Sequence, residues 1–403
     1  MKRLFIFIMV VMMAVVATSR TFDMKQLGAD AKGIKPCTKL INQTIEKAAS
    51  EGGGTIYFPA GTYLTATIHM KSNITLHLES GAIVRFSDRF EDYLPFVTAR
   101  WEGTVMQTLS PLIYAHSAYN LTITGRGTLD GNGLKWWLWE FETRKVIKEN
   151  GGKLPSLDKL QQMWVDANKD LEISDYYKPS LERRMFRPPF IQFYECTNIL
   201  IENVKIINSP FWTVNPAFCD NVTIHGVTIN NPSSNPKGPN TDGINPSSCR
   251  NVRISDCFIS VGDDCITIKS GRDADGRKYG KACENITITN CIMVSGHGGV
   301  VIGSEMSAGV KRIAISNCVF DGTNAGIRLK ASRGRGGVVE DIRVDNIVMK
   351  NIQGDDFIFD LFYDRLSKVE PVSERTPIFR NIHLSNVTGN DIKRIGYIKG
   401  IEE

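Results

Sequence analysis

A short alternation of apolar and polar residues recurs along most of the chain. Each copy begins with a polar residue, most often Asn, and continues with Ile, Val or another apolar residue at every second position. Alternation with a period of two indicates a strand with one buried face. Clear copies begin at Asn198, Asn221, Asn251 and Asn285, and looser copies begin at Asn73, Asn120, Arg312, Asp341 and Asn381. The chain is therefore predicted to be built from repeated strands.

The spacing of the copies predicts a parallel β-helix. From Asn198 onward, consecutive copies start 23, 30, 34, 27 and 29 residues apart, a period typical of stacked units. A propeller blade would need about forty residues, and the leucine-and-asparagine spacing of a leucine-rich repeat is absent. In a β-helix each coil buries the inward face of its neighbour, and right-handed coiling is the default. We therefore expect an all-β, right-handed parallel β-helix with an Asn ladder at the recurring turn.

Two segments depart from this pattern. Residues 38–49 place apolar side chains on one helical face, with Thr38 as the expected N-cap, and predict a helix that covers the first coil. The repeat then disappears between about residues 132 and 189, a stretch with a charged, helix-forming part. We interpret this stretch as an insertion over one side of the β-helix. It is either a stabilising flap or a cleft wall whose rings stack on sugars, since it contains Trp136, Trp137 and Trp139.

The N-terminal residues predict export. Lys2 and Arg3 precede an apolar run from Leu4 to Ala17. That run is too short to span a bilayer comfortably, but it has the length of a signal-peptide core. We therefore expect a signal peptide over residues 1–19 and a single β-helix domain over residues 20–403. The mature protein is expected in a periplasm or outside the cell, with no segment inserted in a membrane.

Composition adds few constraints. The chain has a formal net charge of +5 and is 42% hydrophobic and 23% charged, values ordinary for a folded protein and compatible with an acidic partner. Nine cysteines cannot all pair, and most stand beside strand positions, so we expect small buried side chains. A Cys257–Cys265 or Cys283–Cys291 bridge remains open. The six histidines form no ligand-spaced cluster, so we expect no metal and no cofactor, and nothing indicates nucleic-acid binding.

Four short polar motifs stand in successive coils, about one repeat apart. They are Asn240-Thr-Asp242-Gly, Gly-Asp263-Asp264, Gly-His297-Gly and Arg328-Leu-Lys330. Each motif alone is usually only a turn or a solvated strand face. Neighbouring parallel strands lie about 4.8 Å apart, so four motifs on one face are expected to line a cleft about 15 Å long.

The acidic residues suit glycoside hydrolysis, which needs one protonated and one ionised carboxyl. Crowding of Asp242, Asp263 and Asp264 should raise at least one of their pKa values. Adjacent strand residues point to opposite faces, so Asp263 and Asp264 can share the cleft only at a turn or bulge, which Gly262 favours. Stacked coils would also place Asp242 closer to this pair than the roughly 6.5–9.5 Å expected of inverting enzymes.

The other two motifs suit an acidic sugar. Arg328 and Lys330 are two positions apart, so they share a strand face and together suit a substrate carboxylate. The glycines on either side of His297 are expected to let a sugar approach the backbone closely. An acidic polysaccharide is therefore the predicted partner.

Taken together, the four motifs resemble those of the polygalacturonases, glycoside hydrolase family 28, and the resemblance extends from Gly52 to Asn381. It implies hydrolysis of α-1,4-linked galacturonic acid in pectin, with inversion at the anomeric carbon. Asp263 would be the general acid, and Asp242 and Asp264 would hold and activate the water. His297 would support the acid's protonation or the substrate. The galacturonate at the cleavage site would be bound by Asn240, Arg328 and Lys330.

Two loops resemble those of exo-acting members, which remove galacturonate from the non-reducing end. They are the basic stretch from Lys269 to Lys281 and the segment Gly303–Met306. With the insertion, they could close one end of the cleft. The alternatives are an open endo-acting groove, a rhamnogalacturonan-directed hydrolase and a non-catalytic pectin-binding β-helix. A pectate lyase would need a calcium-binding acidic cluster and an arginine base in place of these motifs.

Overall fold

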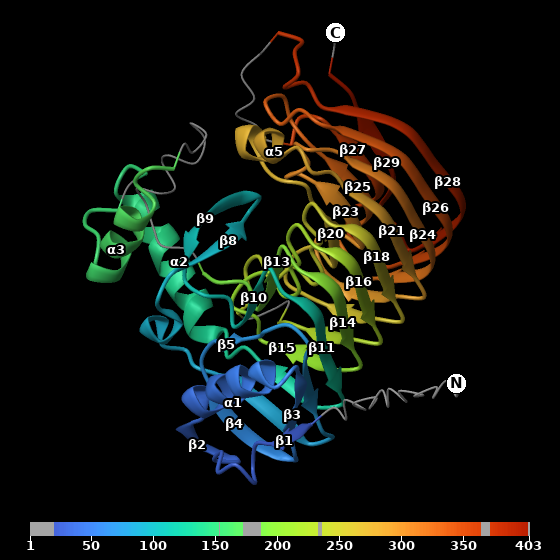
Figure 1. The fold of residues 1–403 in the computed structure, drawn as a ribbon. Helices are drawn as coiled ribbons and strands as arrows, with labels where there is room; N and C mark the ends of the chain where they lie inside the picture. Colours follow the sequence, from blue (N-terminus) through green and yellow to red (C-terminus); the bar gives the residue numbers. More distant parts are fainter. Residues whose placement is uncertain (1–19, 153, 172–186, 233–235, 364–370, 402–403) are drawn as a thin grey trace, which may run out of the picture.

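The computed structural model describes residues 20–152, 154–171, 187–232, 236–363 and 371–401. The predicted signal peptide, residues 1–19, lies outside the described residues. Parallel strands stack coil upon coil from the N-terminal to the C-terminal end of the described chain (Figure 1). The predicted parallel β-helix is confirmed. No helix in the described ranges is long and apolar enough to cross a membrane.

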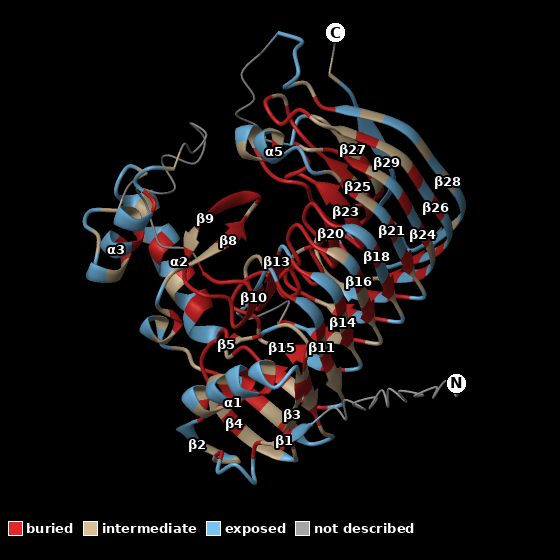
Figure 2. Cartoon of the chain, viewed as in Figure 1, coloured by how far each residue is buried: buried red, intermediate tan, exposed pale blue. Residues whose placement is uncertain are grey.

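One large parallel sheet supplies most of the coil wall. Its inward residues form straight apolar columns, as in the run Ile123, Ile201, Ile224, Ile254, Ile288 and Ile315, in which each residue pairs with the next. All six are buried, and burying each such side chain stabilises the fold by about 1.5–3 kcal/mol. Figure 2 shows these inward faces buried along the stack. The strands are β1 (Thr21–Asp23), β2 (Lys32–Pro36), β3 (Gly54–Phe58), β4 (Gly61–Thr65), β6 (Ile74–Leu78), β7 (Ala82–Phe86), β11 (Tyr119–Gly125), β12 (Thr128–Asp130), β14 (Thr197–Glu202), β15 (Lys205–Ile207), β16 (Asp220–His225), β17 (Thr228–Asn230), β18 (Arg250–Ser255), β19 (Phe258–Ser260), β21 (Cys283–Thr289), β22 (Ile292–Ser295), β24 (Val310–Asp321), β26 (Val338–Lys350) and β28 (Ile378–Asn390).

The second wall of the coil carries the polar motifs. Single bridges at Val214 and Ile244 join its two groups of strands, because Ile191 pairs with Val214, Val214 with Ile244, and Ile244 with Ile266. The first group is β5 (Ile68–His69), β10 (Ile113–His116) and β13 (Ile191–Tyr194). The second group is β20 (Ile266–Ile268), β23 (Val300–Gly303), β25 (Ala325–Lys330), β27 (Asp355–Asp360) and β29 (Arg394–Lys399).

The predicted Asn ladder at the recurring turn is present. Asn120 donates to Asn73, Asn198 to Asn120, and Asn221 to Asn198, at 2.8–3.1 Å between side chains. All four have φ between 55° and 63°. Asn tolerates this left-handed conformation better than other residues with a side chain, and its amide can both donate and accept. The repeated Asn therefore stabilises the turn in two ways: its backbone adopts the left-handed conformation, and its side chain forms hydrogen bonds to the neighbouring coils.

Helix α1 (Thr38–Ser50) covers the first coil, as expected, and buries Ile41, Ile45 and Ala48. The predicted N-cap is wrong by one residue, because Cys37 is the N-cap and Thr38 is already helical. The Thr38 hydroxyl instead accepts a hydrogen bond from the Ala66 amide at 2.7 Å. It therefore fastens the helix to the chain that follows β4 rather than capping its own backbone.

The insertion contains helices α2 (Leu134–Glu149) and α3 (Lys159–Ala167). They lie on the same side of the coil as the hairpin of β8 (Val97–Trp101) and β9 (Thr104–Thr108) and helix α5 (Asp273–Tyr279) (Figure 1). The short helix η1 (Phe90–Tyr93) packs under α2, where Phe90 stacks on Trp136. Trp136 and Trp137 are buried, so the idea that these two rings stack on sugars is wrong. Their apolar faces instead pack the insertion against the coil.

The cysteines are buried, small side chains, as expected. The nine residues are all free thiols, so neither of the bridges left open by the sequence is formed. Several lie in columns. Asp220 pairs with Thr197 and with Arg250, so the cysteines just before these residues, Cys219, Cys196 and Cys249, occupy equivalent positions in neighbouring coils. They fill the interior of successive coils as small apolar side chains do.

Candidate active site

The first three polar motifs lie side by side because the strands that follow them are paired. Ile244 pairs with Ile266, and Ile266 with Val300. The backbone bends at Gly262 and Asp263 just before β20, and this bend lets Asp263 and Asp264 reach the same region, as predicted. Arg328 and Lys330 pair further along the strands, with Val301 and Gly303. The stacking predicted from the repeat spacing is therefore confirmed, with the cations displaced along the strand direction.

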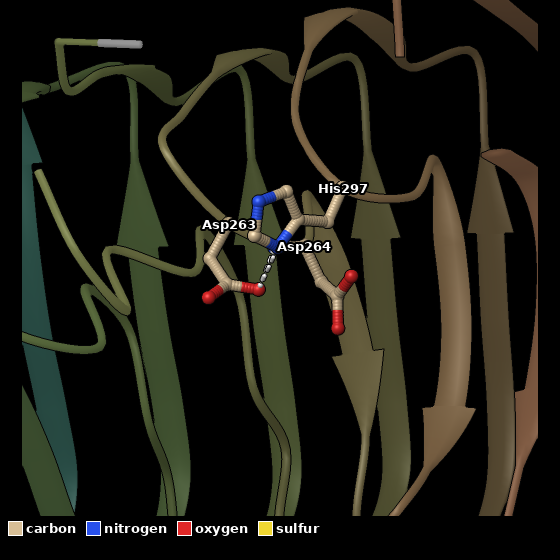
Figure 3. Close-up of side chains that lie close together, drawn as sticks. All are labelled: Asp263, Asp264 and His297. Carbon is tan, nitrogen blue, oxygen red and sulfur yellow. Dashed lines mark hydrogen bonds and ion pairs between the residues drawn. The ribbon is translucent and has the colours of Figure 1, made fainter. Parts of the chain in front are cut away.

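Asp263 is held by His297, and His297 is held by a lysine that the sequence did not single out. The His297 Nδ1 lies 3.0 Å from the Asp263 Oδ1 (Figure 3), and the His297 Nε2 lies 2.6 Å from the Lys237 Nζ. An ammonium can only donate, so Nε2 accepts and the ring proton is on Nδ1. His297 therefore donates a hydrogen bond to Asp263. Burial opposes the charge of Asp263, but this contact outweighs it and lowers the pKa of Asp263 to about 2.

Asp264 forms a buried ion pair with a motif cation. The Lys330 Nζ donates to the Asp264 Oδ2 at 2.7 Å, and both side chains are buried. Burial alone would favour neutral Lys330, but the Asp264 charge reverses this and raises the pKa of Lys330. The ammonium compensates the buried carboxylate of Asp264 through a charge-assisted hydrogen bond.

Asp242 is the carboxyl of the cluster whose protonated form is favoured. Its Oδ2 lies 3.1 Å from the Asn245 Nδ2, 3.4 Å from the Thr267 Oγ1 and 4.0 Å from the Lys269 Nζ. Burial and the negative charge of Asp263 raise the pKa of Asp242 well above its usual value, against the opposing charge of Lys269. The prediction that crowding raises at least one of the three pKa values is confirmed, and the group affected is Asp242.

The three groups of Figure 3 are close enough to be considered as a metal site. One ligand atom from each of Asp263, Asp264 and His297 lies within 4.8 Å of the others. However, Lys330 already compensates the charge of Asp264, and Lys237 already contacts the outer nitrogen of the His297 ring. The Asp263 and Asp264 oxygens also lie closer together than the roughly 6.5–9.5 Å typical of inverting glycosidases, whereas the short separation of Asp242 from this pair stays a prediction.

A cavity of about 210 Å³ opens beside these carboxylates. This volume is below the roughly 300–1,000 Å³ of pockets for drug-sized ligands, which suits a single sugar unit. Of the predicted site residues, Asn240, Asp242, Asp263, Asp264 and Lys330 line it. The loops singled out as exo-like contribute Lys269, Arg272, Ser304 and Glu305.

Other lining residues were missed by sequence reasoning. They are Glu102, Trp212, Arg335 and Tyr363. The sequence did contain a signal for Trp212, because it stands just before Val214, in the same coil wall as Asp242. In the structure the Lys269 Nζ lies 4.5 Å from its ring centroid. Glu102 had none, because it lies on the β8–β9 hairpin, outside every repeat.

Two predicted site residues lie outside this lining. His297 is 38% exposed and reaches the cavity through Asp263. The Arg328 guanidinium lies 5.2 Å from the ring centroid of Tyr363, the same ring that faces Lys330 at 5.0 Å. Tyr363 thus gathers both cations of the fourth motif at one edge of the site by cation–π contact.

The glycines on either side of His297 are required by the packing of the coil. A Cβ at Gly296 would lie 2.6 Å from the Asp263 carbonyl oxygen, and one at Gly298 would lie 2.5 Å from the Val301 side chain. This packing reason applies without a ligand, and the close approach of a sugar stays a prediction. They let the third motif approach the Asp263 backbone closely.

Comparison with known proteins decides the family. The profile described as "Glycosyl hydrolases family 28" matches residues 178–395, more than half of the chain and all four motifs. The chain belongs to glycosyl hydrolase family 28. A second profile, "Rhamnogalacturonase A/epimerase, pectate lyase-like", matches the N-terminal coils over residues 21–93.

Several relatives in family 28 cover most of this chain. A probable polygalacturonase of Vitis vinifera is 33% identical over 77% of the chain, and the chain spans 56% of that relative's length. An endo-polygalacturonase of Pectobacterium carotovorum is 28% identical, over 87% of the chain and 79% of the relative. The solved exopolygalacturonase of Thermotoga maritima is 36% identical with a TM-score of 0.79, over 92% of this chain and 81% of that one.

The raised pKa of Asp242 predicts that this family 28 site costs stability. As pH rises from the ordinary carboxyl range towards that raised pKa, the unfolded chain has lost its proton while the folded state still holds it, so the free energy of unfolding falls until the raised pKa is reached. Asp242→Asn removes the charge and keeps the shape. We expect it to be more stable than the wild type at pH 8, because the wild type must there either bury the charge of Asp242 or take up a proton that the unfolded chain has released.

Calorimetric melting between about pH 5 and pH 9 would measure this difference. It should grow with pH. The lowered pKa of Asp263 does not interfere, because its contribution to stability is lost only as pH falls from 3.8 towards about 2. A difference that is constant with pH would contradict a buried proton on Asp242.

Proposed function

We propose that this protein hydrolyses α-1,4-linked polygalacturonate with inversion, and that it removes galacturonate units from the non-reducing end. The observation that carries the proposal is the cluster of three carboxylates beside a small cavity rich in cations. The described residues that line that cavity include the cations Lys269, Arg272, Lys330 and Arg335. They suit a sugar that carries a carboxylate.

In the proposed reaction, Asp263 gives a proton to the leaving glycosidic oxygen. Asp264, which is paired with Lys330, and Asp242 hold and deprotonate the attacking water, which is the division of labour expected of an inverting pair. Before the sugar binds, the pKa of Asp242 is raised and that of Asp263 is lowered, an order that favours the proton on Asp242. A bound galacturonate adds a further negative charge beside Asp263, and the coupled carboxylates can then pass the proton to Asp263 within the cluster.

The shape of the cavity supports the exo mode. Glu102, at the tip of the β8–β9 hairpin, lies 3.4 Å from the Arg272 Nη1. Arg272 is also within 4.0 Å of Glu305, and Lys269 holds Glu305 at 2.8 Å. These contacts join the hairpin to both exo-like loops at one end of the cavity. A wall at that end would leave room for a single terminal sugar.

Chromatography of the products after brief digestion of de-esterified polygalacturonate tests this proposal. We expect free galacturonic acid alone from the earliest time point. A ladder of oligomers would instead mean an open, endo-acting groove, as the name of the Pectobacterium relative indicates for that protein. Absence of product would turn attention to rhamnogalacturonan fragments or to a non-catalytic binding role.

We also propose that the protein acts in a periplasm or outside the cell. Polygalacturonate is a polymer that does not enter a cytoplasm intact, so an enzyme that removes units from its ends must act outside the cytoplasm. Detection of the activity in culture medium or in a periplasmic extract, and not in spheroplasts, would support this location.

A further inference from the structure

The side chain of Asn240 is held by two guanidinium groups that come from outside the four motifs. Its Oδ1 accepts a hydrogen bond from the Arg187 Nη2 at 2.9 Å and from the Arg144 Nη2 at 3.1 Å. Arg144 lies on α2, within the insertion, and Arg187 lies at its C-terminal end. The two ends of the described insertion therefore converge on one side chain that lines the cavity.

Glu140, one turn before Arg144 on α2, fixes both cations. Its Oε1 lies 2.6 Å from the Arg144 Nε, and its Oε2 lies 3.5 Å from the Arg187 Nε. Glu140 and Arg187 are buried, whereas Arg144 is about half exposed. A buried charge of this kind is stable only with its partners in place, so the arrangement is set by folding and not by the ligand.

Arg187 also holds the backbone beside Asn240. Its Nη1 donates to the carbonyl oxygens of Pro239 and Pro210, both at 2.7 Å, and its guanidinium lies 5.0 Å from the ring centroid of Phe211. The residue before Asn240 and the Asn240 amide are thus fixed by the same planar group. Because the guanidinium is planar and rigid, these contacts leave the Asn240 side chain little freedom of orientation.

These contacts determine which end of the amide faces the cavity. A guanidinium has donors only, so the Asn240 oxygen must face the arginines and its NH₂ group must point away from them. We propose that Arg144 and Arg187 are positioning residues that orient Asn240 so that its Nδ2 donates to the acidic sugar at the cleavage site. A reversed amide would present an oxygen there and repel a carboxylate. This inference rests on the proposed function and gives the insertion a role in it.

A double-mutant cycle between Arg144 and Asn240 tests the inference. Arg144 is exposed enough that Arg144→Met should fold. We expect this substitution to lower kcat/KM on oligogalacturonate about five- to tenfold in the wild type. In the Asn240→Ala background it should change kcat/KM by less than about twofold, because the group it orients is gone. Equal losses in both backgrounds would overturn the inference.

Two further variants separate positioning from charge and from folding. Lys145→Met removes the neighbouring exposed cation of α2 and should leave kcat/KM at the wild-type value. Asn240→Asp keeps two oxygens for the arginines but has no donor, so its melting temperature should not fall while kcat/KM falls at least about 100-fold. Wild-type activity in Asn240→Asp would exclude donation by Nδ2.

Failure of the proposed function would give a different result from failure of this inference. If the wild type releases no galacturonate from any oligogalacturonate, the proposed function is wrong. Crystal structures of the wild type and Arg144→Met then decide the positioning on their own. A displaced or doubly oriented Asn240 side chain in the variant would support it, and an unchanged, equally ordered side chain would overturn it.

Discussion

Asp263→Asn is expected to reduce kcat on polygalacturonate by about 10²–10⁴-fold, the contribution typical of a general acid, while the fold is kept. Asn has nearly the volume of Asp, and its amide oxygen can still accept the hydrogen bond from His297 that Asp263 accepts at 3.0 Å. It cannot, however, give a proton to the leaving oxygen. Kinetics with an unchanged melting temperature would establish a chemical rather than a structural loss.

A substrate with a good leaving group identifies which carboxyl is the acid. In the free site the pKa of Asp242 is raised and that of Asp263 is lowered, so the two roles need separate tests. An aryl galacturonide whose phenolate leaves without protonation should be cleaved by Asp263→Asn at close to the wild-type rate. Asp242→Asn should be inactive on both substrates. The opposite pattern would make Asp242 the acid, and near wild-type cleavage of the polymer by Asp263→Asn would remove Asp263 from the acid role.

Lys330→Met is expected to have the second large effect, and on stability as well as on activity. It leaves Asp264 buried at 1% exposure without the ammonium that lies 2.7 Å away. Removal of one partner of a buried pair typically costs about 3–5 kcal/mol. Chemical denaturation would measure the loss. Galacturonate binding should also weaken far more than galactose binding, because Lys330 lines the cavity as one of its cations.

The double variant Lys330→Met/Asp264→Asn is the matched control. It removes both charges, so most of the lost stability should return while activity stays low. Two results would contradict this account. One is a Lys330→Met protein within about 1 kcal/mol of the wild type, which would make the pair energetically unimportant. The other is an equal loss of galacturonate and galactose binding, which would remove Lys330 as a carboxylate partner.

The insertion shows why a sequence can predict a segment without its function. Its position and α3 were predictable, because the repeat stops at about residue 132 and a charged, helix-forming part lies around Lys153 to Leu171, but α2 was not predicted. Its tryptophans suggested a sugar-stacking wall, yet Trp136 and Trp137 are buried. The insertion instead reaches the cavity through Glu140, Arg144 and Arg187, which hold Asn240. Nothing in a charged helix tells which of its cations will meet an amide from another coil.

The coil and the cluster of three carboxylates could be predicted from the sequence alone. Alternation and a near-constant period fix which residues face inward and which coils are neighbours, because both follow from backbone geometry. For that reason the repeat spacing alone places Asp242, Asp263 and Asp264 together, as the paired strands confirm. Three features could be known only from the tertiary structure: the raised pKa of Asp242, the contact between Lys237 and His297, and the position of Glu102 beside the cavity. Those depend on burial and on side chains brought together from loops of irregular length, whose meeting points no repeat specifies.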